Sequence, residues 1–297
     1  MDRVFPDYGR SRLPYDLLIY PPCELPTEIW ERIIDWMCVE PQEIPITSTL
    51  HACALVCRAW RDRSRLHLYR SLTLQSNNIT KFFSTLRRSP NFSMSSIQQI
   101  SITCFENYPL SSLLFRRDLD ALTYLEILHL NLAREHPQFM KSPMPRTVRT
   151  LDLWGLREWR VSSLIRFINT FHSLTSLTIS DTSILDHKEE MLPPLNPVPN
   201  RQLLSLTLEL APGMNKILEF YVLEGVFLSH LKSLSLQWWS FPDKYDHHTY
   251  FDGAKSLLDH CRSTLEHLTL NFEDVPMIDE VSDICKPQCV VTYSVWI

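Results

Sequence analysis

The sequence predicts an α/β chain in which a small helical module precedes an irregular solenoid of parallel strands, with helices or loops on the convex side. Two observations predict this fold. One apolar pattern recurs along the second part of the chain at nearly constant spacing, and two short amphipathic strings stand ahead of it. The predicted domains are an N-terminal segment over 1–22, the helical module over 23–70 and the repeats over 71–297.

The recurring pattern is L-x-x-L-x-L, with other apolar residues accepted at the leucine positions. Its middle positions are separated by 28, 28, 23, 26, 29, 28, 34 and 25 residues. This is the period of leucine-rich repeats, in which each unit supplies one short strand and a return segment. The copies are Tyr69/Leu72/Leu74, Ile97/Ile100/Ile102, Leu125/Leu128/Leu130, Val148/Leu151/Leu153, Leu174/Leu177/Ile179, Leu203/Leu206/Leu208, Leu231/Leu234/Leu236, Leu265/Leu268/Leu270 and Val290/Tyr293/Val295. An ordinary α/β sheet with helices on both faces is the alternative.

The segments between the strands are of two kinds. Some place apolar side chains three and four residues apart, as amphipathic helices do, and others are rich in proline and read as irregular connections. Helices are expected over 78–89, 161–171, 215–227 and 254–265, and irregular connections over 135–146 and 186–200.

The outward positions of the predicted strands are mostly small and polar. Of the 27 residues that flank the last two apolar positions of each copy, 15 are Ser or Thr and none is Lys or Arg. Ser and Thr suit an exposed strand, so most of this face needs no functional explanation. The exceptions are candidate substrate-binding residues, namely His129, Asp152, Trp154, Glu209 and Gln237.

The widest step between copies contains an aromatic segment, 237–253. Large exposed aromatic side chains are common anchors of protein interfaces, so Trp238, Trp239, Phe241 and Tyr245 are further candidates for substrate binding. In the alternative, these rings fold back and cap the edge of the solenoid.

The front module begins with a short amphipathic helix. Pro26 suits the first position of a helix, Glu28 complements the positive end of the helix dipole, and Ile29, Ile33 and Trp36 fall on one stripe. A second helix is expected to follow a proline-interrupted connection. It carries apolar residues on two sides, which exceeds what a module of about 50 residues buries alone and suggests a partner.

Two strings in this module resemble an F-box. L-P-x-E-I stands at Leu25 to Ile29, and L-V-C-R-x-W follows at Leu55 to Trp60. The whole chain is similar to fungal F-box proteins with degenerate leucine-rich repeats. In that family the F-box docks on a Skp-type adaptor, which hangs from a cullin scaffold with its RING subunit, and the second domain holds a protein substrate for ubiquitination.

The resemblance implies a non-catalytic recognition subunit of an SCF-type cullin-RING ubiquitin ligase. It assigns adaptor contacts to Leu25, Pro26, Ile29, Ile33, Val56, Cys57 and Trp60. In the alternative, Val56, Cys57 and Trp60 pack the core of the module itself. A second alternative for the function is a non-catalytic scaffold whose F-box binds the adaptor without a ligase role.

Composition argues against other classes of function. The formal net charge is -5, so neither nucleic acid nor a membrane is expected as a partner. The chain has five glycines, too widely spaced for any common phosphate-binding loop. The cysteine pairs Cys53/Cys57 and Cys285/Cys289 lie in different predicted modules, so no metal and no cofactor are expected. The first residues do not read as a signal peptide, and we expect a cytoplasmic or nuclear protein with reduced cysteines.

Overall fold

The structure is a computed structural model. It describes residues 25–38, 46–88, 96–104, 122–132, 145–181, 183–185, 202–210, 228–238, 247–272 and 289–295. The chain divides into two compact units, Met1–Leu68 (unit 1) and Tyr69–Ile297 (unit 2). Among the residues described, no helix has the length and apolar character that a membrane crossing requires.

Unit 1 contains three described helices, α1 (Thr27–Met37), α2 (Ile46–Val56) and α3 (Arg58–Leu68). Pro26 stands immediately before α1, and its carbonyl accepts the first helical hydrogen bond from the Ile29 amide at 2.9 Å. Glu28 lies in the first turn, where a negative charge is favourable. The helix therefore begins one residue after Pro26, the residue expected at its first position.

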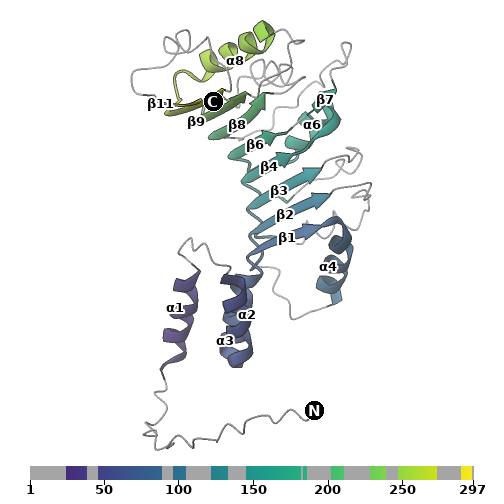
Figure 1. Cartoon of the computed structure of the whole chain (residues 1–297), viewed down its shortest axis with the longest axis vertical. Coiled ribbons are helices and arrows are strands. Elements are labelled where there is room, and N and C mark those ends of the chain that lie inside the picture. Colours follow the sequence, from purple (N-terminus) through teal and green to yellow (C-terminus); the bar gives the residue numbers. More distant parts are fainter. Residues whose placement is uncertain are drawn as a thin grey trace, which may run out of the picture. The chain divides into compact units, whose positions relative to one another are not determined.

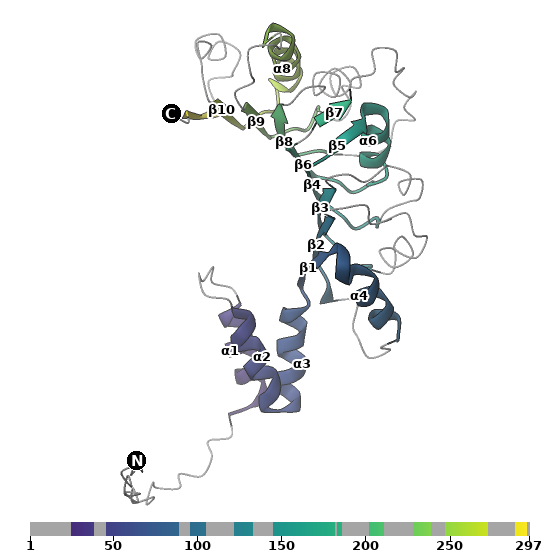
Figure 2. The same cartoon turned by 45° about the vertical axis from the view of Figure 1, so that its right-hand side comes forward.

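The expectation of one helix after the proline-rich connection is wrong. The chain leaves the helical conformation at Cys57, and α3 lies beside α2 rather than continuing it (Figure 2). No Gly or Pro occurs between residues 46 and 70, so the sequence contains no helix-breaking residue that would predict this break. The packing of α3 against α1 explains the break, because a continuous helix would carry the second half away from α1.

The interior of unit 1 is small. Ile34 on α1 and Leu50 on α2 are its described buried apolar residues. The rings of Trp30 and Trp60 lie with their centroids 4.8 Å apart and tilted by 49°, which joins α1 to α3. Such a small core is expected to give limited stability by itself.

The described part of unit 2 forms a parallel sheet of nine strands that follow one another in chain order (Figure 1). The strands are β1 (Ser71–Gln75), β2 (Gln99–Cys104), β3 (Ile127–Leu132), β4 (Thr150–Trp154), β6 (Ser176–Ser180), β8 (Ser205–Leu210), β9 (Ser233–Trp238), β10 (His267–Phe272) and β11 (Val290–Val295). From β1 to β10 the middle position of each predicted copy pairs with the middle position of the next. The predicted strands and their register are confirmed over these eight copies, and the sheet is compatible with a solenoid.

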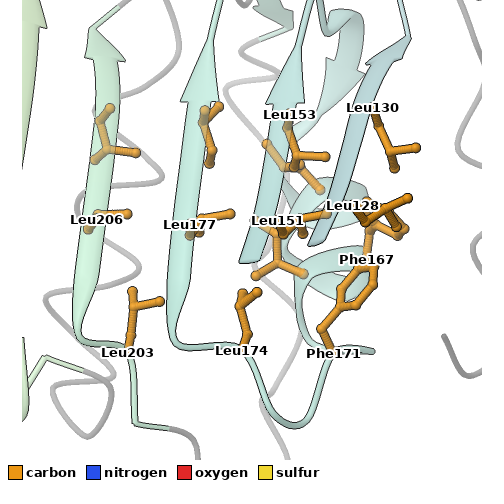
Figure 3. Packing of buried hydrophobic residues seen from close by; sticks show 14 of the residues in the cluster. Leu128, Leu130, Leu151, Leu153, Phe167, Phe171, Leu174, Leu177, Leu203 and Leu206 are labelled. Carbon is orange, nitrogen blue, oxygen red and sulfur yellow. The ribbon is translucent and has the colours of Figure 1, made fainter. Parts of the chain in front are cut away.

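The apolar positions of the repeats form one continuous core. Leucines at equivalent positions of neighbouring strands point to the same side of the sheet, where Phe167 and Phe171 meet them (Figure 3). The described helices of unit 2 are α4 (Ser76–Arg88), α6 (Val161–Ile168) and α8 (His247–Cys261). All three contribute buried side chains to this core, for example Phe83, Phe167 and Leu257. They lie on the same face of the sheet, so the alternative with helices on both faces finds no support in the described residues (Figure 2).

Several local expectations were wrong. The last strand pairs Leu268 with Val291 rather than with Tyr293, a shift of two residues. A separate pair of short parallel strands, β5 (Arg157–Arg160) and β7 (Ser183–Leu185), was not predicted. Helix α8 begins at His247, within the segment expected to be a loop, and α6 ends at Ile168, three residues early. The helix expected over 215–227 lies outside the described residues.

Candidate functional site

Helix α1 presents an apolar stripe to solvent. Leu25, Ile29, Ile33 and Trp36 recur at spacings of four, four and three residues and are all exposed, Trp36 to 66%. The opposite side of the helix carries the buried Ile34. Among the described residues of unit 1, α1 therefore leaves more apolar surface exposed than it buries.

The junction between α2 and α3 presents a second apolar surface. Leu55 is 87% exposed and Val56 63%, and Cys57 beside them is exposed. Val56 and Cys57 therefore do not pack the core of the unit, as the alternative would require. Trp60 differs, because it is half-buried against Trp30.

Of the seven predicted adaptor contacts, six are exposed in the structure and Trp60 alone is half-buried. The prediction missed two of the most exposed apolar residues, Trp36 and Leu55. Both were visible in the sequence, since Trp36 continues the stripe of α1 and Leu55 opens the second F-box-like string.

An ion-pair cluster fixes α3 against α1. The Asp35 carboxylate accepts two hydrogen bonds from the Arg63 guanidinium, and the Nε2 atom of His67 lies 2.7 Å from Asp35 Oδ1. The bonds from Arg63, followed by the bond from His67, lower the pKa of Asp35 from its ordinary 3.8 to about 2, although burial opposes them. The same pairing raises the pKa of Arg63.

This cluster predicts that unit 1 loosens in acid. Because the pKa of Asp35 is lower in the folded chain, unfolding takes up a proton, so the stabilisation is complete above about pH 4 and is lost as pH falls to about 2. Because a third of the Asp35 side chain is exposed, we expect the pairing to contribute about 1–2 kcal/mol to the free energy of unfolding. Hydrogen exchange of α1 and α3 amides in the full chain measures it. At pH 7 Asp35→Asn should exchange faster than the unchanged chain, and near pH 2 the two should agree; a difference independent of pH would contradict the assignment.

The outward face of unit 2 contains a hydrogen-bonded row across four strands. His129 Nδ1 lies 2.9 Å from Asp152 Oδ2, and Gln99 Nε2 lies 2.9 Å from His129 Nε2. Thr178 also hydrogen-bonds to Asp152. Since the Gln99 amide nitrogen can only donate, the ring accepts at Nε2 and donates from Nδ1 to Asp152. The bond from His129 lowers the pKa of Asp152, against the effect of burial.

This row orients the His129 ring but does not offer it a nucleophile. A histidine acting as a general base needs a hydroxyl or thiol at its free nitrogen. Here that nitrogen faces the amide of Gln99. The arrangement is better suited to holding the Asp152 carboxylate in one position as a hydrogen-bond acceptor.

Trp154 stands in the next row of the same face. It is 55% exposed and lies in register with Asn131 on β3 and Ser180 on β6. Gly155, which follows it, has a positive φ of 69°, a conformation that a side chain would disfavour and that lets the chain leave β4. The indole of Trp154 is therefore held at the carboxyl end of a strand whose next residue turns away.

Glu209 and Gln237 extend this row toward β9. Glu209 Oε2 accepts a hydrogen bond of 2.6 Å from the amide of Asp181, whose φ of 46° is left-handed. Burial raises the pKa of Glu209, and the charge of Asp181 acts in the same direction. Gln237 lies in register between Glu209 and Asn271. Within the described residues, the buried Oδ1 of Asn271 has no hydrogen-bond partner.

The structure thus places the five candidates on one face of the sheet, on β3 and β4 and, beyond β6, on β8 and β9. Sequence reasoning missed Gln99, Thr178 and Asp181, which hydrogen-bond to them. Trp239, Phe241 and Tyr245 lie outside the described residues, and for Trp238 only the backbone in β9 is described.

Metal and cysteine chemistry receive no geometric support in the described part of the chain. No three His, Cys, Asp or Glu side chains there are grouped to hold a metal ion. Among the described residues, Cys53 and Cys57 are free thiols.

No protein-family model matches the chain, and no curated protein matches it in sequence. The case for a function therefore depends on its own residues.

Proposed function

We propose that the chain is a substrate-receptor subunit of an SCF-type cullin-RING ubiquitin ligase. Unit 1 docks on a Skp-type adaptor as an F-box, and unit 2, a leucine-rich-repeat-like domain, binds the protein to be ubiquitinated. The proposal combines the resemblance of the two strings at Leu25–Ile29 and Leu55–Trp60 with the surfaces that the structure gives them.

The observation that carries the proposal is the exposure of apolar side chains in both strings. Ile29 and Val56, one from each string, are exposed, whereas the described residues of unit 1 bury few apolar side chains. An apolar surface that a small unit leaves in water is stabilised when a partner covers it. A fold in which these residues formed the core of unit 1 would have argued against adaptor binding.

The mechanism needs no reacting group in this chain. A receptor that holds its substrate beside a charged conjugating enzyme raises the effective concentration of the substrate lysine at the thioester. Two units with separate binding surfaces suit this role, because one surface serves the adaptor and the other the substrate. Proximity is then the whole contribution to the rate.

Co-expression with a Skp-type adaptor, followed by size exclusion, tests the proposal. We expect a stoichiometric complex that also recruits cullin and supports ubiquitination of a co-purifying protein. A chain that stays monomeric beside the adaptor would overturn the proposal. A stable adaptor complex that does not recruit cullin would support the scaffold instead.

A further inference from the structure

The open face of the sheet in unit 2 has an unusual balance of charge. Its outward strand positions include the carboxylates of Asp152 and Glu209, and Asp181 follows β6 directly. The outward positions of all nine strands contain no Lys or Arg. A surface that must bind phosphate or an acidic segment needs Arg or Lys, so this face is complementary to a cation.

Trp154 supplies the second requirement for a cation, an accessible aromatic face. It is more than half exposed, whereas 15 of the 27 outward positions on the whole face carry the smaller Ser or Thr. Asp152 precedes it by two residues on the same strand face, a separation of about 7 Å. A guanidinium within about 6 Å of the indole centre would therefore lie within reach of the Asp152 carboxylate.

Asp152 is prepared for such an ion pair. His129 and Thr178 already hydrogen-bond to it, so the carboxylate is held in place before any ligand arrives. It lies half-buried, where a charge is screened less than on an open surface. Ordering the acceptor in advance reduces the entropy lost on binding.

Glu209 extends the negative surface along the row of Trp154. One of its oxygens accepts the Asp181 amide, and the second carboxylate of this pair, Asp181, is exposed. Burial and the neighbouring charge of Asp181 raise the pKa of Glu209, so its negative charge costs more free energy here than in water. A cation bound nearby would relieve that cost.

We propose that this face binds a basic segment of a protein partner, with an arginine side chain stacked on Trp154 and paired with Asp152. Arginine fits better than lysine, because its planar group stacks on an indole while its edge pairs with a carboxylate. The assignment of this partner as a ubiquitination substrate rests on the proposed function. The proposed binding of an arginine side chain to Trp154 and Asp152 does not rest on that function.

Fluorescence anisotropy with the full chain tests the proposal. The probes are short labelled peptides of one neutral background that carry paired arginines, lysines, glutamines or glutamates. We expect the arginine peptide to bind tightest, and its affinity to fall as salt is added. Equal binding of the arginine and glutamine peptides, or tighter binding of the glutamate peptide, would overturn the proposal.

Variants assign the binding to this face. Trp154→Ala should weaken binding of the arginine peptide about tenfold. Asp152→Asn and Glu209→Gln should weaken it severalfold each, because each amide keeps one acceptor oxygen but loses the negative charge. Tyr124→Ala is the matched control, because Tyr124 is 57% exposed but lies outside the strands. Equal losses for Trp154→Ala and Tyr124→Ala would overturn the assignment. Adaptor binding of each variant is measured in parallel, so failure here is distinguishable from failure of the ligase proposal.

Discussion

A chain carrying both Ile29→Asp and Val56→Asp is expected to lose its complex with a Skp-type adaptor, with an affinity at least about a hundredfold weaker. Both side chains are exposed in the structure, Ile29 to 39% and Val56 to 63%, so the carboxylates keep contact with water in the free chain. In the complex the same carboxylates would be buried against an apolar partner without a counter-charge. Most of the expected loss therefore comes from the complex, and the helix content of the free chain measures the remainder.

The measurement is the adaptor affinity of the purified full chain, with helix content followed by circular dichroism. Leu66→Asp is the matched control, because Leu66 is an exposed apolar residue of the same unit outside both strings. The control should bind within about threefold of the unchanged chain, as expected for a position outside the contact. A double variant that binds equally well would remove these two residues from the interface.

Trp60 is a poorer test of adaptor binding than its place in the second string suggests. Its ring packs on Trp30, so Trp60→Ala would remove a contact between α1 and α3 as well as any contact with a partner. A weaker complex could then result from a loosened unit 1. The exposed positions avoid this ambiguity.

The repeats were predictable because their signal is redundant. Each strand alternates apolar and polar residues, and equivalent apolar residues recur at a step that varies little. A strand with an ambiguous pattern can therefore be located by its spacing from the adjacent copies. The last strand has a neighbouring copy on one side only. In the sequence, Val291, Tyr293 and Val295 alternate with polar residues, so a shift of two residues keeps the same apolar pattern, and the pairing with β10 decides the register.

The break at Cys57 and the contacts of the outward face depend on packing rather than on local pattern. No Gly or Pro lies within residues 46–70, and the break at Cys57 lets α3 pack against both α2 and α1. His129 and Asp152 were both singled out as unusual, but their hydrogen bond follows only once β3 and β4 are aligned. The repeat spacing contained that information, since both residues follow the middle leucine of their copies.

The apolar core of unit 2 gives the largest expected change in stability. Leu206→Ala should reduce the free energy of unfolding by about 2–5 kcal/mol, because Leu206 is fully buried and its neighbours in register, Leu177 and Leu234, are buried as well. A parallel sheet built from successive units transmits such a loss to both adjacent units. Urea unfolding of the full chain, followed by circular dichroism, measures it.

Thr207→Ala is the matched control on the same strand. Thr207 points to the outward face and is half-exposed, so its loss should cost less than about 1 kcal/mol. Equal losses at the two positions would contradict the assignment of inward and outward faces, on which the candidate binding surface depends.

Because unit 1 forms a separate compact unit, Leu206→Ala should also retain its adaptor complex under conditions in which unit 2 is still folded. Loss of that complex would mean that adaptor binding requires unit 2. It would contradict the proposal that unit 1 alone binds the adaptor while unit 2 binds the substrate.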